Sequence, residues 1–276
     1  MPELPEVEVV RRGLEHWTAG RVVAGVEVRH PRAVRRHPGS PQDFESRLQG
    51  APLTRVARRG KFLWWPLGDS ALVGHLGMSG QFRVDAAPGE HTRIAFDIGL
   101  PLLFDDQRTF GGMWVEPLAD DLPLSLRHIA PDPFSPQYHR ADVVRRIRRR
   151  HAPIKALLLD QGIVSGIGNI YADEALWRSR VHWRTPGEDL SARRLGMLLD
   201  SAAAVMQQAM DAGGTSFDRL YVNVNGSSGY FQRELAAYGR SGLPCPRCGA
   251  AIVREPFANR SSYRCPRCQR LPACSA

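Results

Sequence analysis

The placement of the cysteines constrains this chain more than any other feature of its sequence. All five lie at or after residue 245, as Cys245, Cys248, Cys265, Cys268 and Cys274. The first four form two C-x2-C pairs separated by sixteen residues. Paired knuckles with this spacing predict a site in which four thiolates hold one zinc ion. A segment of about 30 residues is too small for an apolar core of its own, so we expect the metal to supply its folding energy.

Disulfides or free thiols are the alternative interpretation of these cysteines, and a reducing compartment disfavours disulfides. Four thiolates leave zinc no open coordination position, so the predicted ion is structural, and Cys274 has no predicted role. The segment is also rich in arginine, which fits either a nucleic-acid groove, the interpretation we favour, or a solvated face. Its arginines are Arg240, Arg247, Arg254, Arg260, Arg264, Arg267 and Arg270.

The overall charge also favours a polyanionic partner. Thirty-seven Lys and Arg against 28 Asp and Glu give a formal net charge of +9. Only Lys61 and Lys155 are lysines. GC-rich codons explain the excess of arginine by default, so the two lysines stand out as candidates for phosphate contacts. No apolar run approaches the length of a membrane span, and the N-terminus has no signal-peptide pattern, so we expect a cytoplasmic protein without a membrane partner.

Residues 1 to about 130 are predicted to form mainly strands. Apolar residues alternate with polar ones around 26–28 and 94–98, and FLWW at 62–65 is a short buried run. Turns that contain Gly and Pro recur between them, which indicates a β-sandwich or barrel. One helix is predicted at the start, with Pro5 in its first position. Pro2 and Glu3 then lie immediately before a helix N-terminus.

A Pro- and Asp-rich stretch at about 118–138 is predicted to be a linker, and residues 141–210 are predicted to be helical. Between two of these helices lies QGIVSGIGN, whose glycines allow tight turns. Such turns present backbone N–H groups and a helix N-terminus to an anion such as phosphate. An ordinary connection between helices is the alternative.

Motifs along almost the whole chain resemble the formamidopyrimidine-DNA glycosylases of base excision repair. They are PELPEVE at 2–8, GKF at 60–62, HLGMSG at 75–80, DQRTFGG at 106–112, SGIGNIYADEALW at 165–177, NRSSY at 259–263 and the four cysteines. The resemblance implies an α+β multidomain fold with an N-terminal β-sandwich and helix at 1–130, a helix–two-turn–helix domain at 131–238 and a zinc finger at 239–276. One common form of the family's motif is DPRRFG, whereas this chain has DQRTFG at 106–111. Arg108 and Phe110 keep the places of the family's arginine and phenylalanine.

The resemblance implies that Pro2 is the nucleophile and Glu3 its general acid and base. Removal of Met1 is expected because Pro2 is small, and it exposes a secondary amine with a useful neutral fraction near pH 7. That amine attacks the anomeric carbon of the damaged nucleotide and forms a Schiff base. Strand cleavage by β,δ-elimination then follows from the same intermediate. A frayed terminus is the ordinary alternative for an N-terminal dipeptide.

Further residues are expected to contact DNA. Lys61 and Arg260 join the implied catalytic set. Lys61 would hold the phosphate beside the lesion or touch the damaged base, and Arg260 would grip phosphates near the lesion. Lys155 and Asn169 are implied phosphate contacts. Met78, Arg108 and Phe110 match the residues that fill the space left by the extruded base. The segment 213–231 corresponds to a lesion-capping loop.

We therefore expect a monomeric bifunctional DNA glycosylase and abasic-site lyase that acts on oxidised purines in double-stranded DNA, with one structural Zn²⁺. An enzyme for oxidised pyrimidines, from the sister branch of the family, is one alternative. A zinc protein that binds damaged DNA without cutting it is another. Borohydride trapping separates the enzymes from the binding protein, and comparing 8-oxoguanine with thymine glycol separates the two enzymes.

Overall fold

The protein folds into two compact units in the computed structural model, which describes residues 2–214 and 234–271. Unit 1 contains the chain up to His128 and a segment that begins at Met210, and unit 2 contains Ile129–Ala209 and the described residues from 234 onward. The helices and the finger thus share unit 2, and the predicted boundaries of three domains stay predictions. None of the described helices has the length and apolar character that crossing a membrane requires.

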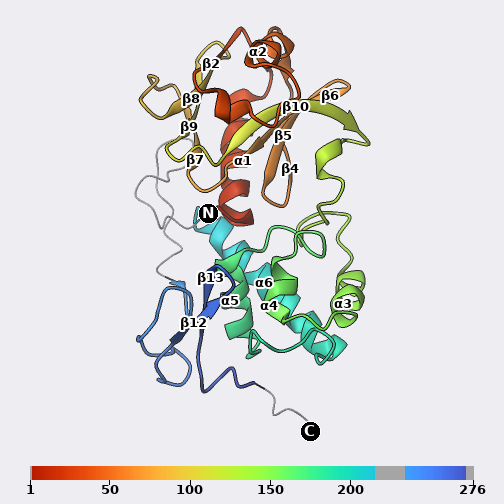
Figure 1. The fold of residues 1–276 in the computed structure, drawn as a ribbon, viewed down its shortest axis with the longest axis vertical. Coiled ribbons are helices and arrows are strands. Elements are labelled where there is room, and N and C mark those ends of the chain that lie inside the picture. The colour runs from red at the N-terminus through yellow and green to blue at the C-terminus, as the bar shows by residue number, and fades with distance from the viewer. Residues whose placement is uncertain (1, 215–233, 272–276) are drawn as a thin grey trace. The chain divides into compact units, whose positions relative to one another are not determined.

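Unit 1 is a sandwich of two antiparallel sheets, which confirms the prediction from alternating side chains (Figure 1). The larger sheet has the order β11-β10-β6-β5-β4, with β4 Ala57–Arg59, β5 Phe62–Leu67, β6 Ser70–His75, β10 Gly112–Ala119 and β11 Leu122–Pro123. The smaller has the order β2-β8-β9-β7, with β2 Gly25–Val28, β7 Gly80–Val84, β8 Thr92–Asp97 and β9 Pro101–Asp106. A separate pair joins β1 Arg21–Val22 to β3 Pro52–Leu53.

Aromatic side chains from both sheets fill the core between them. Trp65 of β5 packs against Phe82 of β7 with ring centroids 5.8 Å apart, and Phe82 packs against Phe104 of β9 at 5.2 Å. All three side chains are at most 1% exposed. Such edge-on and tilted pairs add about 1 kcal/mol each beyond the apolar area they bury. The Trp65–Phe82 pair joins the two sheets, and the Phe82–Phe104 pair joins neighbouring strands of the smaller one.

Helix α1, Leu4–Thr18, is anchored to this core along its length. Val7, Val10 and Leu14 recur at helical spacing and are at most 1% exposed, and burying each contributes about 1.5–3 kcal/mol. At the other end, Trp65 Nε1 donates to Thr18 Oγ1 at 3.1 Å. The first residues of the chain therefore start from a fixed helix. Because the helix begins at Leu4, Pro5 occupies its second position rather than the first.

Two further helical segments of unit 1, η1 (Pro31–Val34) and α2 (Pro41–Leu48), follow β2. The predicted linker at 118–138 is partly wrong, because its first half is regular structure. It begins inside β10 and contains β11 and the short helix η2, Leu124–Leu126. The chain passes from one unit to the other after His128.

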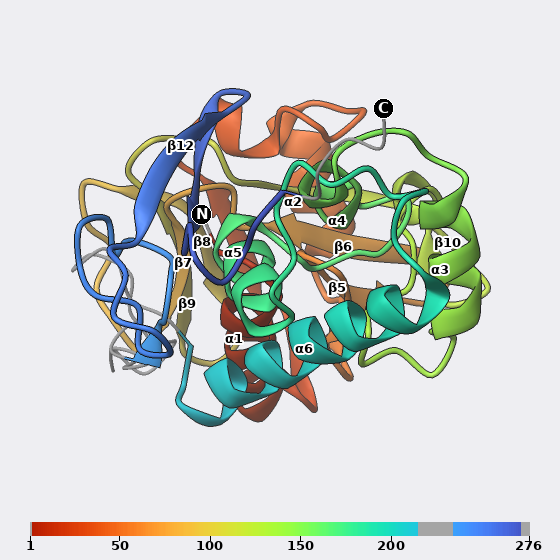
Figure 2. The ribbon, with the colours of Figure 1, turned by 90° about the horizontal axis from the view of Figure 1, so that it is seen from below.

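The described part of unit 2 contains four helices, which lie where the sequence predicted a helical region, and one hairpin (Figure 2). The helices are α3 Arg140–Arg148, α4 Ile154–Leu159, α5 Asn169–Arg178 and α6 Ala192–Asp211, and the hairpin pairs β12 Val253–Phe257 with β13 Arg260–Arg264. Helices α4 and α5 contact each other, and α5 also contacts β13. This second contact supports the finger hairpin on the helices.

Candidate active site

The start of the chain is buried and tightly held within unit 1. Pro2 is buried, and Glu3 is 3% exposed. Glu3 caps α1 in a capping box: its side chain accepts from the backbone of Glu6, while its own backbone N–H donates to Glu6 Oε2 at 2.8 Å. Two otherwise unsatisfied donors are paired in this way. A carboxylate and the residue that carries the predicted nucleophile thus occupy one defined place.

An ion-pair cluster ties α1 to the turn that precedes β5. Glu8 Oε2 accepts from Arg58 Nε at 2.9 Å and from Arg11 Nε at 3.1 Å. Burial alone raises the pKa of Glu8, but the hydrogen bonds and charges of Arg11 and Arg58 outweigh it and hold the pKa below its usual value. Arg58 Nη1 also donates to the Gly60 carbonyl at 2.9 Å. The residue after that carbonyl is Lys61, so one cluster fixes both the helix and this lysine.

Lys61 lies in an electropositive part of unit 1 and is 8% exposed. The nearby His75 ring is kept neutral, because burial, followed by the charges of Arg36, Lys61 and Arg35, lowers its pKa to about 4. Its Nδ1 accepts from the Gly77 N–H at 3.1 Å. The ring proton therefore resides on Nε2, which is a donor. Cations grouped around a neutral donor suit an anion such as phosphate.

Met78, Arg108 and Phe110 lie together on two loops that touch through their backbones. Met78 is 43% exposed, Phe110 is 46% exposed, and the Arg108 guanidinium carbon lies 5.5 Å from the centre of the Phe110 ring. Gly77, at φ +63°, packs so closely on the second loop that a Cβ would lie 2.4 Å from the Gly111 nitrogen. Only glycine permits this approach. The structure thus brings the three predicted space-filling residues to one exposed site.

One buried carboxylate and one exposed arginine hold these two loops in shape. Asp106, 1% exposed, accepts from Ser79 Oγ at 2.5 Å in one loop and from the Gly111 N–H at 2.7 Å in the other. Arg35 donates to the carbonyls of Phe110 and Gly111, each at 2.9 Å. Large side chains at the tips are therefore carried on a rigid base.

In unit 2, three predicted DNA-contacting residues converge on the finger hairpin. Asn169 is the first residue of α5, and its Nδ2 donates to the Ser261 carbonyl at 3.0 Å. Lys155 Nζ donates to the same carbonyl at 3.2 Å. The residue before Ser261 is Arg260, which begins β13 and is exposed. Residues about 100 positions apart in the chain thus meet at one point.

Lys155 does not lie on the surface, where the sequence analysis expected it to meet a phosphate. Its side chain is fully buried, its Nζ lies 2.7 Å from Asp173 Oδ1, and it also lies 4.9 Å from the centre of the Phe257 ring. Asp173 in turn accepts from Ser262 Oγ and from the Tyr263 N–H, each at 2.9 Å. The Asp173 carboxylate therefore offsets the positive charge of Lys155 near the start of α4. In the structure Lys155 joins the helices to the hairpin.

The four predicted zinc ligands lie together in unit 2, with their Sγ atoms all within 4.8 Å of one another. Thiolates about 2.3 Å from a tetrahedral zinc lie about 3.8 Å apart, so the donor set fits zinc. Burial raises the pKa of Cys265 to about 12. Burial also opposes ionisation of Cys245, but hydrogen bonds from Trp177 and from nearby backbone N–H groups lower its pKa to about 6. Cys274 lies outside the described residues.

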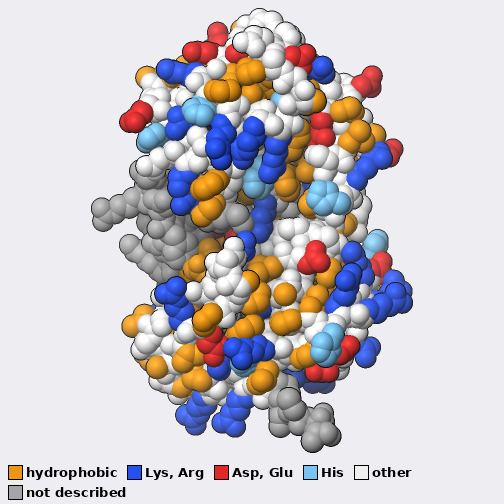
Figure 3. Space-filling view, viewed as in Figure 1, with side chains coloured by type: hydrophobic (Ala, Val, Ile, Leu, Met, Phe, Trp, Pro, Cys, Tyr) orange, Lys and Arg blue, Asp and Glu red, His pale blue; other side chains and the backbone are white. Residues whose placement is uncertain are grey.

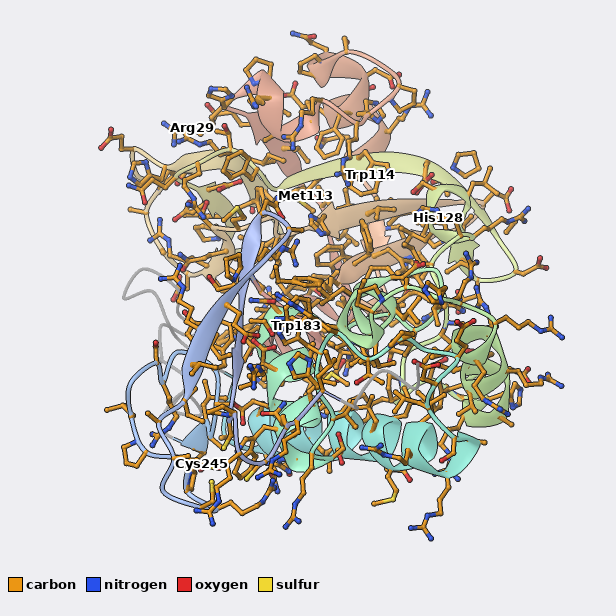
Figure 4. All side chains as sticks on the ribbon, turned by 60° about the horizontal axis from the view of Figure 1, so that its bottom comes forward. Arg29, Met113, Trp114, His128, Trp183 and Cys245 are labelled. Carbon is orange, nitrogen blue, oxygen red and sulfur yellow. The ribbon has the colours of Figure 1, made fainter. Side chains whose placement is uncertain are left out.

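The finger is attached to the rest of unit 2 at two places. The Arg247 guanidinium stacks 4.1 Å from the centre of the Trp177 ring of α5 and donates to the Trp177 carbonyl at 3.0 Å. Toward the hairpin, Trp183 Nε1 donates to Glu255 Oε2 at 2.6 Å. Figure 4 labels Cys245 in the finger and Trp183 beside the hairpin. The finger and the helices therefore form one polar assembly.

Comparison with known proteins gives the family. Three family models match in succession: the formamidopyrimidine-DNA glycosylase N-terminal domain at residues 1–113, its H2TH domain at 129–219, and a zinc finger found in FPG and IleRS at 242–271. The formamidopyrimidine-DNA glycosylase of Acidothermus cellulolyticus is 56% identical over 99% of this chain and 98% of its own length. That of Streptomyces avermitilis is 54% identical over 99% of both chains. The chain belongs to the formamidopyrimidine-DNA glycosylase family.

Solved structures agree with this membership. The MutM (Fpg) protein of Thermus thermophilus is 37% identical, with a TM-score of 0.86 over 97% of this chain and 98% of that one. The Fpg of Lactococcus lactis, solved in a complex with DNA that contains an abasic site, is 32% identical, with a TM-score of 0.85 over 98% of this chain and all of that one.

Several residues that shape this glycosylase fold escaped the sequence analysis. His75 lies in the HLGMSG motif and Glu6 in PELPEVE, but the sequence analysis gave neither residue a role of its own. Glu174, 1% exposed, accepts from the backbone N–H groups of 236, 237 and 238 at 2.8–3.0 Å. Its only signal in the sequence was a charge on an otherwise apolar helix face. The predicted capping loop at 213–231 lies outside the described residues beyond Gly214.

Proposed function

We propose that this protein is a bifunctional DNA glycosylase and abasic-site lyase that removes oxidised purines, chiefly 8-oxoguanine and formamidopyrimidines, from double-stranded DNA. Its nucleophile is the amine of Pro2, freed by removal of Met1. Membership of the formamidopyrimidine-DNA glycosylase family supports the glycosylase class. The lesion-containing DNA bound by its structural relatives supports the substrate class.

The observation that carries the proposal is the pairing of Pro2 with Glu3 in a buried, capped position before α1. A nucleophile is most effective when its position is fixed before the substrate arrives, because little entropy is then lost in the reaction. The hydrogen bond from the Glu3 N–H to Glu6 Oε2 at 2.8 Å fixes this segment. A frayed terminus would show neither the burial nor the capping box.

The chemistry follows from a secondary amine beside a carboxyl group. The Pro2 nitrogen forms a bond to C1′ as the bond between C1′ and the damaged base breaks, and the base leaves with the bonding electrons and takes up a proton. Glu3 protonates O4′, so that the sugar ring opens and a Schiff base forms. Loss of a proton from C2′ then expels the 3′ phosphate, and a second elimination expels the 5′ phosphate.

The other residues hold the DNA around this reaction. Lys61 and the Nε2–H of His75 would bind phosphate near the lesion, and the exposed Arg260 at the hairpin tip would bind another. Met78 and Phe110 would enter the stack where the damaged base has been extruded, while Arg108 would bond to the base left unpaired. Asn169 would contribute from the N-terminus of α5. Zinc, held by the four cysteines, would supply folding energy to the finger and no reaction chemistry.

Reductive trapping tests this proposal directly. Sodium borohydride added during reaction with an 8-oxoguanine duplex should link the protein covalently to the DNA, and peptide mass analysis should locate the adduct on Pro2. Pro2→Gly replaces the ring-fixed secondary amine by a mobile primary amine, and Glu3→Gln removes the general acid. Each should lower excision by more than about a thousandfold, since each alters a group that acts on the reacting atoms. Duplex affinity should change by less than about threefold.

Glu15→Gln is the matched control for Glu3→Gln, because it removes a carboxylate at the far end of the same helix and should leave excision intact. Removal of Met1 is verified by mass in every preparation. An adduct on Lys61, or normal excision by Pro2→Gly, would refute the mechanism. Faster excision of thymine glycol than of 8-oxoguanine would assign the protein to oxidised pyrimidines instead.

A further inference from the structure

A groove of about 940 Å³ lies between α3 and the first half of α6, entirely within unit 2. Figures 1 and 2 both place these helices side by side there, and an ion pair from Arg140 to Asp200 joins them at 2.5 Å. None of the residues implied in catalysis, DNA binding or zinc binding lines this groove. It is therefore a separate feature of the surface.

The sides of the groove are strongly basic. Five arginines line it, against one carboxylate, that of Asp200. Figure 3 shows the basic side chains that gather over α3. Two of the five are paired with carboxylates, Arg140 with Asp200 and Arg145 with Asp142, so the charge of the other three attracts an anionic partner. The five are Arg140, Arg145, Arg148, Arg149 and Arg193.

The floor of the groove is apolar and leaves unused space. Val144 and Met197 line it, and Met197 is 53% exposed. Gly196 also lines it, in the interior of α6, where glycine disfavours the helix relative to alanine. A Cβ at this position would meet only the Arg140 guanidinium carbon, at 4.0 Å. Nothing in the described chain requires a glycine here, so the open floor is suited to a group that approaches from outside.

We propose that this groove docks an acidic protein segment that also carries apolar side chains. Arginine and methionine are enriched at protein interfaces, and a groove between two helices admits a single chain. A DNA backbone would account for the arginines, but it has no side chain to cover Met197 or to fill the space over Gly196. The basic sides would attract the acidic residues of the segment, and the floor would bury its apolar ones.

Fluorescence anisotropy with a labelled peptide tests the proposal on the full-length zinc-loaded protein. The probe is a peptide of about twelve residues in which Asp and Glu alternate with Leu and Phe, and the control peptide replaces its Leu and Phe with Ser. Arg193→Glu should weaken binding of the probe at least tenfold. Arg194→Glu makes the same charge change at the neighbouring exposed position outside the groove and should weaken it less than twofold.

Gly196→Leu provides an independent test that does not alter charge. The added side chain should fill the floor and weaken probe binding at least tenfold, with no fall in the unfolding midpoint, because leucine favours the helix. The Ser-containing peptide should bind at least tenfold more weakly than the probe. Equal probe binding by Arg193→Glu and Arg194→Glu, or no probe binding at all, would overturn the proposal. A selective loss of duplex affinity in Arg193→Glu, with probe binding unchanged, would make the groove a DNA contact and would also overturn it.

Discussion

The two units present their exposed functional side chains on supports of opposite chemistry. In unit 1, the loops that carry Met78 and Phe110 extend from a sandwich whose interior is aromatic and aliphatic. In unit 2, the hairpin that carries Arg260 rests on buried polar groups, among them Lys155 and Asp173, and on a cysteine cluster whose apolar surroundings are small. The sandwich of unit 1 is held by buried apolar area, whereas the finger of unit 2 and its attachment to α4 and α5 depend on charges, hydrogen bonds and metal ligands.

This difference predicts how each unit responds to damage. Apolar packing is spread over many contacts, so a single change in unit 1 removes a fraction of the stability. A buried ion pair or a metal site depends on each partner, because removing one leaves the other uncompensated. We therefore expect changes in the finger and in the buried ion pair beneath it to have larger effects than changes in the sandwich. The four predictions below test that contrast, in order of decreasing effect.

The largest effect should come from removing the metal. We expect about one zinc per chain by metal analysis, and chelation should lower duplex affinity more than a hundredfold, because zinc contributes about 10–16 kcal/mol to the folding of such segments. The near-ultraviolet circular dichroism of unit 1 should persist, since its core contains none of the cysteines. Cys274→Ser is the control and should keep both metal and affinity. Full binding by metal-free protein would remove the contrast between the units.

Breaking the buried pair in unit 2 should come next. Lys155→Met should lower the free energy of unfolding by about 3–5 kcal/mol in urea titrations, because it leaves the Asp173 carboxylate buried without its cation. The double change Lys155→Met with Asp173→Leu should recover most of that loss. If Lys155→Met instead leaves stability unchanged and reduces the salt dependence of DNA binding by one phosphate, Lys155 contacts DNA as the sequence analysis expected.

In unit 1, acid should destabilise the fold through His75. Its pKa falls from 6.5 to about 4 on folding, so the unfolded chain takes up the proton first. The free energy of unfolding therefore has its full value above pH 6.5. It decreases as the pH falls toward 4, by at most about 3 kcal/mol. His75→Gln should flatten the dependence of unfolding free energy on pH over this window, whereas the exposed His128→Gln should not. Equal slopes in the two variants would contradict the assignment.

The smallest effect should come from Arg35, which braces the loop of Phe110. Arg35→Ala removes hydrogen bonds to the carbonyls of Phe110 and Gly111 at an exposed site, so we expect less than about 1 kcal/mol in stability. Single-turnover excision should still fall about tenfold, since the loop loses its fixed shape. Arg32→Ala, in the short helix η1 that precedes Arg35, serves as the control. A large loss of stability would show that unit 1 also depends on single polar groups.

Local patterns in the sequence were enough to predict most of the fold. Alternation at 94–98 became β8, the run at 62–65 lies in β5, and the four helical stretches after 140 are α3 to α6. The helix α2 was missed, although Ser40 caps it and Pro41 opens it. Strands of two residues, such as β1 and β3, carry too few positions for any period to be visible.

For the candidate site too, residues whose setting depends on their neighbours in the chain could be predicted, and residues whose partners lie far along the chain could not. The position of Pro2 and Glu3 immediately before α1 was predicted because it depends on neighbouring residues in the chain. Asp173 and Glu174 were not, because their partners lie far along the chain: the Tyr263 N–H is 90 residues from Asp173, and the Ala236 N–H is 62 residues from Glu174. Burial of Lys155 was missed for the same reason, since its partner Asp173 is only identified once α4 and α5 are packed together.

The capping box at the first helix also has a practical consequence. Glu6 holds the main chain at Glu3, and Pro2 is buried, so the first residues of the protein have little room to move. On the proposed chemistry, any purification handle or unprocessed residue left in front of Pro2 converts the amine into an amide and silences it. Such a preparation would still bind damaged duplexes but would not excise the base, so it would block access to the lesion.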